Sequence, residues 1–84
     1  MTRRKILSID ELKELSKDKP IDCFISLMGG MCRSSKSVQY DLRQNVFSVF
    51  NDIVGSEDIL TVEELYTDSN IGEAIDKGAF FCFN

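Results

Sequence analysis

The sequence contains no histidine and no tryptophan, and its only proline is Pro20. Histidine is the commonest general base, metal ligand and catalytic-triad partner near neutral pH, so the usual residue of acid–base and metal chemistry is missing. The cysteines form no Cys-x-x-Cys pair and have no histidine with which to complete a zinc site. We therefore expect no metal, no cofactor and no enzymatic activity.

The cysteine count is odd, so Cys23, Cys32 and Cys82 cannot all pair within one chain. Such usage is typical of reduced thiols in the cytosol, and we expect Cys23 and Cys82 to be small buried residues of the core. Cys32 lies beside Arg33 and near Lys36, whose positive charges lower the pKa of a thiol. Two interpretations of Cys32 stay open, an inert turn thiol and a redox-sensing thiol.

Long hydrophobic runs are also absent. No segment approaches the roughly 18 apolar residues of a membrane helix, and residues 1–8 lack the apolar stretch of a signal peptide. We expect a protein that does not contact membranes and that acts in the cytoplasm, the host cytoplasm if a phage encodes it. Its 84 residues, 43% of them hydrophobic, predict one globular domain, residues 1–84.

The stretch "GGMCRSSKS", residues 29–37, comes closest to a catalytic motif. From Gly30 it matches the phosphate-binding P-loop, except that Ser35 replaces the second glycine. A P-loop needs a helix that begins at its Lys-Ser pair, whereas residues 35–41 alternate with the period of two that is typical of a strand. A catalytic Ser–Lys pair fails as well, because Lys36 on a hairpin is too solvated to act as a base. The stretch therefore predicts a β-hairpin turn.

Capping signals predict three short helices, and alternation predicts the strands. Ser8 and Glu11 form a capping box that opens a helix over residues 9–17, while Thr61 and Asn70 open two more helices. Period-two or wholly apolar segments are typical of strands. The predicted strands are residues 21–28, 35–41, 46–50 and 79–83.

This order of elements predicts an α+β fold. We expect a small antiparallel sheet, a three-strand meander plus a C-terminal strand, with short helices packed mainly on one face. Residues 52–58 are expected to form a loop, and no linker or internal repeat is present. An edge strand on so small a sheet can also pair with a second copy, which gives a homodimer about a two-fold axis.

Basic residues are scarce in the second half of the chain. Residues 44–84 carry one basic residue against eight acidic ones, whereas residues 1–43 carry nine basic and six acidic residues. Two interpretations are open, a solvated acidic surface and a surface that occupies a basic site on a partner protein. The acidic residues assigned to such a partner surface are Glu57, Asp58, Glu63, Glu64 and Asp68.

The basic half predicts an alternative surface for RNA or DNA. Cations of the hairpin and the N-terminal tail can contact phosphates, and Tyr40, which shares a strand face with Lys36, can stack on a base. The acidic pI of 4.6 and the lack of an RNA-binding motif argue against this hypothesis. Its residues are Arg3, Arg4, Lys5, Arg33, Lys36, Tyr40 and Arg43.

Two functions therefore remain. The first is a non-enzymatic binding protein that inhibits or modulates a larger protein, as expected of a small accessory protein of a bacterium or phage. The alternative is a small RNA- or DNA-binding protein that uses the basic hairpin and the N-terminal tail. A steep loss of nucleic-acid affinity with added salt distinguishes the second function from the first.

Overall fold

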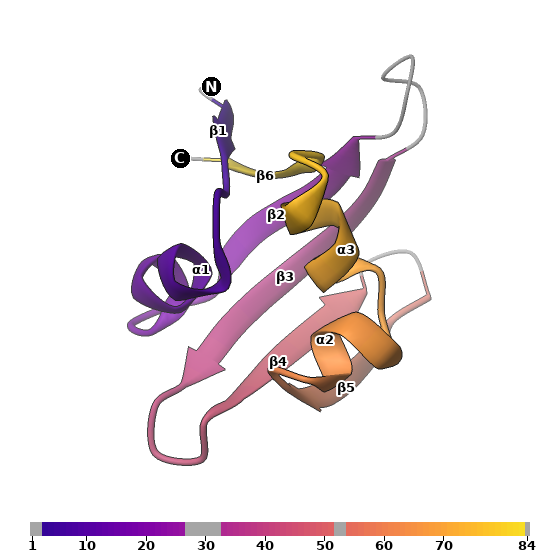
Figure 1. The fold of residues 1–84 in the computed structure, drawn as a ribbon. Coiled ribbons are helices and arrows are strands. Elements are labelled where there is room, and N and C mark those ends of the chain that lie inside the picture. The colour runs from indigo at the N-terminus through magenta and orange to yellow at the C-terminus, as the bar shows by residue number, and fades with distance from the viewer. Residues whose placement is uncertain (1–2, 27–32, 52–53, 84) are drawn as a thin grey trace.

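The computed structural model describes residues 3–26, 33–51 and 54–83. Within these residues the chain forms six strands and three short helices, which are drawn in Figure 1. In chain order they are β1 (Arg3–Lys5), α1 (Ile9–Ser16), β2 (Ile21–Ser26), β3 (Arg33–Asp41), β4 (Val46–Asn51), β5 (Ser56–Thr61), α2 (Glu64–Thr67), α3 (Ile71–Asp76) and β6 (Phe80–Phe83).

All six strands belong to one antiparallel sheet with the order β1-β6-β2-β3-β4-β5. Strands β2 to β5 follow one another as a meander, while β6 returns from α3 to lie between β1 and β2 (Figure 1). The predicted α+β class, the antiparallel meander and the interior position of the C-terminal strand are therefore confirmed.

The predicted number of strands is wrong, because β1 and β5 are also present. Residues 52–58, expected to be a loop, include the start of β5, which pairs with β4 over its whole length. Residues Arg3–Lys5, expected to be part of a tail, pair with β6. Both strands lie at an edge of the sheet, where charged residues are common. Neither has the hydrophobic alternation that identifies a strand locally.

The capping predictions for the second and third helices have different outcomes. Thr61 Oγ1 accepts a hydrogen bond from the backbone N–H of Glu64 at 3.2 Å, and Glu64 Oε1 accepts one from the N–H of Thr61 at 2.9 Å. This is a complete capping box, as predicted. The Asn70 side chain makes no capping bond. Ser69 Oγ instead accepts from the backbone N–H of Ile71 at 3.3 Å, which corrects the third prediction.

The helices lie on one face of the sheet, and the main core lies between them and that face (Figure 1). One core row crosses three strands, because Phe47 pairs in register with Tyr40 on one side and with Leu60 on the other. Phe47 is fully buried, and its ring centroid lies 4.9 Å from that of Tyr40. The helical side chains that close the core are Leu12, Leu65, Ile71, Ala74 and Ile75.

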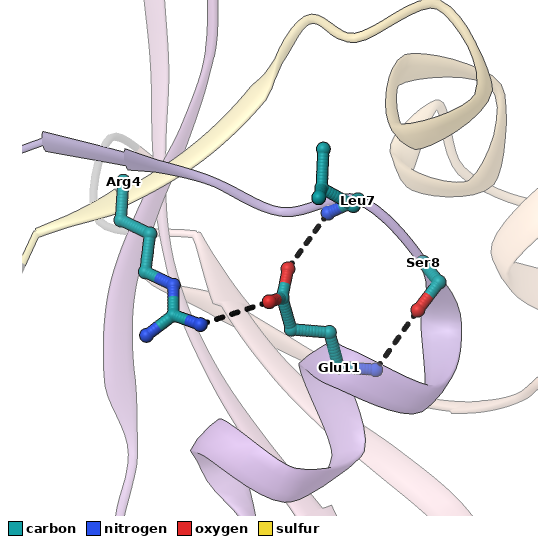
Figure 2. A network of polar contacts seen from close by, with 4 residues as sticks. All are labelled: Arg4, Leu7, Ser8 and Glu11. Carbon is teal, nitrogen blue, oxygen red and sulfur yellow. Dashed lines mark hydrogen bonds and ion pairs between the residues drawn. The ribbon is translucent and has the colours of Figure 1, made fainter.

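Glu11 connects β1 to the start of α1 (Figure 2). Its carboxylate accepts hydrogen bonds from the backbone N–H of Leu7 at 2.8 Å and from the Arg4 guanidinium at 2.9 Å, while its own N–H donates to Ser8 Oγ at 3.1 Å. The bond from Leu7 first, and then the one from Arg4, hold the pKa of Glu11 below its ordinary value. The predicted cap at Ser8 is confirmed, and the α1 helix ends one residue earlier than expected.

Glu11→Ala is expected to lower the free energy of unfolding by about 1 kcal/mol at neutral pH, because the N–H of Leu7 and the Arg4 side chain lose their acceptor. Since the folded-state pKa of Glu11 is depressed, its contribution is present above the ordinary value of 4.5 and disappears as the pH falls through the folded value. Urea unfolding at neutral and at strongly acid pH measures both effects. The control is Glu14→Ala, which removes only an exposed pair with Lys17 and should change little. Equal losses in both variants would contradict this role of Glu11.

Candidate functional site

The structure excludes a P-loop in the candidate motif. Lys36 lies in the middle of β3, so no helix begins there to face a phosphate. Strand alternation also places Ser35 and Ser37 on the opposite face of the sheet from Lys36, which separates these two serines from the candidate lysine. The side chain of Ser34, the third candidate serine, lies outside the described part of the chain. Gly30 and Cys32, the latter with its redox hypothesis, lie outside the described residues.

A cleft of about 400 Å³ lies on the helix-covered face, between the sheet and the end of α2. Lys36 of β3 and Asp58 of β5 line it from the sheet, and Asp68, directly after α2, lines it from the helix side. The cleft thus brings together three residues that the sequence assigns to two different hypotheses. We refer to it as the α2 cleft and define it by Lys36, Asn51, Asp58, Tyr66, Asp68 and Asn70.

The α2 cleft is lined by one basic and two acidic side chains. Within the part of the chain that the structure describes, Lys36, Asp58 and Asp68 form no ion pair. Asp68 Oδ1 accepts a hydrogen bond from the Thr67 hydroxyl at 3.2 Å. With Glu63 exposed at the start of α2, negative charge exceeds positive charge around the cleft. This arrangement favours a cationic group as its ligand.

A close approach of α2 and α3 positions Tyr66 at the cleft. A Cβ atom at Gly72 would lie only 2.5 Å from Tyr66 Cδ1, so the ring occupies the space that any other residue at position 72 would fill. Tyr66 is still 45% exposed and presents its ring at the edge of the α2 cleft. No local sequence pattern indicates this contact, because Gly72 and Tyr66 belong to different helices.

The five predicted acidic residues gather around β5 and α2, but they do not form one surface. Glu57 alternates with Asp58 along β5 and therefore lies on the opposite, helix-free face. The carboxylate of Glu64 is engaged in the capping box. Only Asp58 and Asp68 line the cleft, and Glu63 lies beside it on the exposed end of α2.

The basic residues of the nucleic-acid hypothesis lie in several separate places. Arg4 is ion-paired with α1, and Lys36 lines the α2 cleft. Arg43 is exposed in the turn between β3 and β4, far along the sheet from the N-terminal strand. Strand alternation places Arg3 and Lys5 on the helix-free side of β1, beside β6, but the Lys5 ammonium reaches toward Gly78 at the end of α3. The predicted cluster of hairpin and tail cations therefore does not form.

Tyr40 is not available for base stacking, which corrects its predicted role. It shares a face with Lys36, as expected, but this is the face that the helices cover. The residue is 6% exposed, its ring packs on Phe47, and the ammonium of Lys13 lies 5.4 Å from the ring centroid. The side chain of Arg33, the remaining residue of the hypothesis, lies outside the described part of the chain.

The opposite face of the sheet carries no helix of the described chain, and we refer to it as the open face (Figure 1). Near its β6 end Phe24 is 2% exposed, because its ring stacks on those of Phe81 and Phe83 at centroid distances of 5.5 and 4.9 Å. Near its β5 end Phe50 and Ile59 are 39% and 55% exposed. Apolar groups gathered on a solvated face are typical of an interaction surface. The sequence analysis assigned no function to these residues.

Cys23 and Cys82 have the core role that the sequence predicts. They are register partners on β2 and β6, and both are buried free thiols. Burial raises the pKa of each thiol above its ordinary value. Both groups therefore stay protonated near neutral pH, where a thiol is a poor nucleophile.

Comparison with protein-family models, with curated proteins and with solved structures gives no match. No helix within residues 3–26, 33–51 and 54–83 is long and apolar enough to cross a membrane. In the same ranges, no three Cys, Asp or Glu side chains lie together as metal ligands. The α2 cleft and the open face are the two features on which functional inferences are based.

Proposed function

We propose that this protein is a non-enzymatic binding protein that inhibits or modulates a larger protein by receiving one of its basic side chains in the α2 cleft. The observation that carries the proposal is the convergence of Asp58 and Asp68 on one cleft from different elements. Neither has an ion-pair partner among the described residues. An arginine or lysine placed between them would form charge-assisted hydrogen bonds, which are stronger than neutral ones.

The groups around the cleft suit a protein partner. Tyr66 is half exposed and held in place by Gly72, and tyrosine is enriched in protein interfaces because it offers a rigid apolar ring with a polar end. Glu63 adds negative charge that accelerates encounter with a basic surface. Lys36, on the sheet side of the cleft, would favour a partner that also carries an acidic group, and thereby orient it.

The alternative function, binding of RNA or DNA, receives less support. Its basic residues are dispersed over both faces of the sheet, and Tyr40 is buried. A phosphate that approached Lys36 would also approach Asp58 and Asp68, whose charges repel it.

The test begins with capture of proteins from a bacterial lysate on the immobilised chain at low salt, followed by affinity measurements with the purified partner. Asp58→Lys/Asp68→Lys should weaken binding by at least about tenfold, because it replaces attraction by repulsion at the cleft. The matched control is Asp10→Lys/Asp76→Lys, which reverses two exposed charges on α1 and α3 and should bind like the wild type. Equal weakening by the two double variants would refute the proposal. Retention of nucleic acid alone would support the alternative.

A further inference from the structure

A single row of side chains crosses the open face from one edge of the sheet to the other. Each strand contributes one residue to this row, and neighbouring residues in it are register partners on adjacent strands. Asp22 lies next to Phe83 because Cys23 and Cys82, one position along each of these antiparallel strands, are register partners. We refer to this row as the transverse row. From β1 to β5, in the order of the sheet, it consists of Arg3, Phe83, Asp22, Ser37, Phe50 and Glu57.

The transverse row has opposite charges at its two ends and an aromatic ring next to each charge. Arg3 and Glu57 are both exposed, and neither forms an ion pair in the described part of the chain. Phe83 and Phe50 come next from either end, and both keep part of their surface exposed. A hydrogen-bond acceptor and a hydroxyl donor, Asp22 and Ser37, occupy the centre.

We propose that a second copy of this chain covers the open face, in a homodimer whose two-fold axis runs parallel to the strands between the two sheets. Such an axis reverses the order of the strands, so that β1 of one copy lies over β5 of the other. Arg3 then faces Glu57 of the partner subunit, and Phe83 faces Phe50 of the partner subunit. At the axis, Asp22 faces Ser37 of the partner subunit. This inference goes beyond the proposed function and uses none of the residues that define the α2 cleft.

The proposed arrangement satisfies the physical requirements of an isologous interface. Stacked sheets lie about 10 Å apart, a separation that two phenylalanine rings fill and that an Arg–Glu pair can bridge. Each contact occurs twice because of the symmetry. The sheet edges fit a dimer less well, because β1 has only three residues and β5 carries the adjacent charges of Glu57 and Asp58.

Another occupant of the open face would be a single-stranded nucleic acid, stacked on Phe81 and Phe83 beside Arg3. The charge pattern disfavours it, because Asp22 and Glu57 lie on the same face. The Lys5 ammonium lies beside Gly78, about 3.6 Å from where a Cβ atom there would be, and so is directed toward the end of α3. In the proposed dimer both Arg3 and Glu57 have a partner of opposite charge, whereas a polyanion would pair with Arg3 alone.

The proposal is tested by charge reversal at the two ends of the transverse row, with sedimentation velocity over a micromolar concentration series. The wild type should dimerise. Arg3→Glu and Glu57→Arg should each weaken dimerisation by about tenfold or more, because each creates two like-charge pairs in the symmetric dimer. The combined variant Arg3→Glu/Glu57→Arg should dimerise nearly as well as the wild type. Arg43→Glu and Asp76→Arg, which reverse exposed charges outside the row, are the controls and should not change dimerisation.

Three results would overturn the proposal. The first is a wild-type protein that stays monomeric at high micromolar concentration. The second is a dimer that neither single reversal weakens, or that the combined variant fails to restore, since both point to pairing elsewhere, such as a sheet edge. The third is a monomeric protein that binds a single-stranded oligonucleotide, with an affinity that Arg3→Glu lowers and Glu57→Arg raises. Circular dichroism of each variant verifies that it is folded.

Discussion

Phe47→Ala is expected to lower the free energy of unfolding by about 4 kcal/mol, the typical loss for a buried phenylalanine that leaves a cavity. The side chain is fully buried and occupies the middle of the core row between Tyr40 and Leu60. Its removal takes away the ring on which Tyr40 packs, at a centroid distance of 4.9 Å. Domains of this kind have a total stability of about 5–15 kcal/mol. At the lower end of that range the variant would keep only about 1 kcal/mol and be close to the limit of folding.

Phe50→Ala is the matched control, since it makes the same truncation three residues further along β4, on the open face. Phe50 is 39% exposed, so its loss should lower the free energy of unfolding by less than about 1 kcal/mol. Urea unfolding followed by circular dichroism measures both variants, at a protein concentration low enough to dissociate a dimer. Equal losses would show that both faces of the sheet are buried alike and would contradict the one-sided core.

The parts of the fold that local signals specify could be predicted from the sequence. In β2 and β4 the alternation of apolar residues marks the face that the helices cover. Ser8 and Thr61 each precede a helix and cap it with the side-chain oxygen. Strand β5, with the sequence SEDILT, has only one buried residue, Leu60. Its extended conformation depends on hydrogen bonds to β4, a tertiary interaction that no local pattern encodes.

The candidate site was less predictable, because strand alternation decides which face a charge occupies. The sequence predicts that residues 52–58 form a loop and that Glu57 and Asp58 both belong to one acidic surface. In β5 they point to opposite faces, one into the transverse row and the other into the α2 cleft. Lys36 illustrates the same effect. Its assignment to a strand was right, but the cleft above it is assembled by α2, about 30 residues further along the chain.

Helices α2 and α3 approach each other closely at Gly72 and Tyr66, and Tyr66 lines the α2 cleft. Gly72→Ala is expected to destabilise the protein by about 1–2 kcal/mol, although alanine is the better helix former. The new Cβ atom would lie 2.5 Å from Cδ1 and 2.6 Å from Cγ of Tyr66. Because Cγ lies at the base of the ring, the whole ring must rotate or the helices must separate. Either response moves Tyr66 at the cleft, so affinity for a protein partner should fall as well.

Removing the ring should reverse the sign of this effect. In a Tyr66→Ala background the methyl group at position 72 meets no ring, so Gly72→Ala should stabilise the protein by up to about 1 kcal/mol through its helix propensity. Urea unfolding of the wild type, both single variants and the double variant gives the coupling free energy between the two positions. A loss of the same size in both backgrounds would mean that the Tyr66 ring is not what requires glycine at position 72. Tyr66 would then not be held at the α2 cleft by α3, and its place in the proposed interface would have no structural basis.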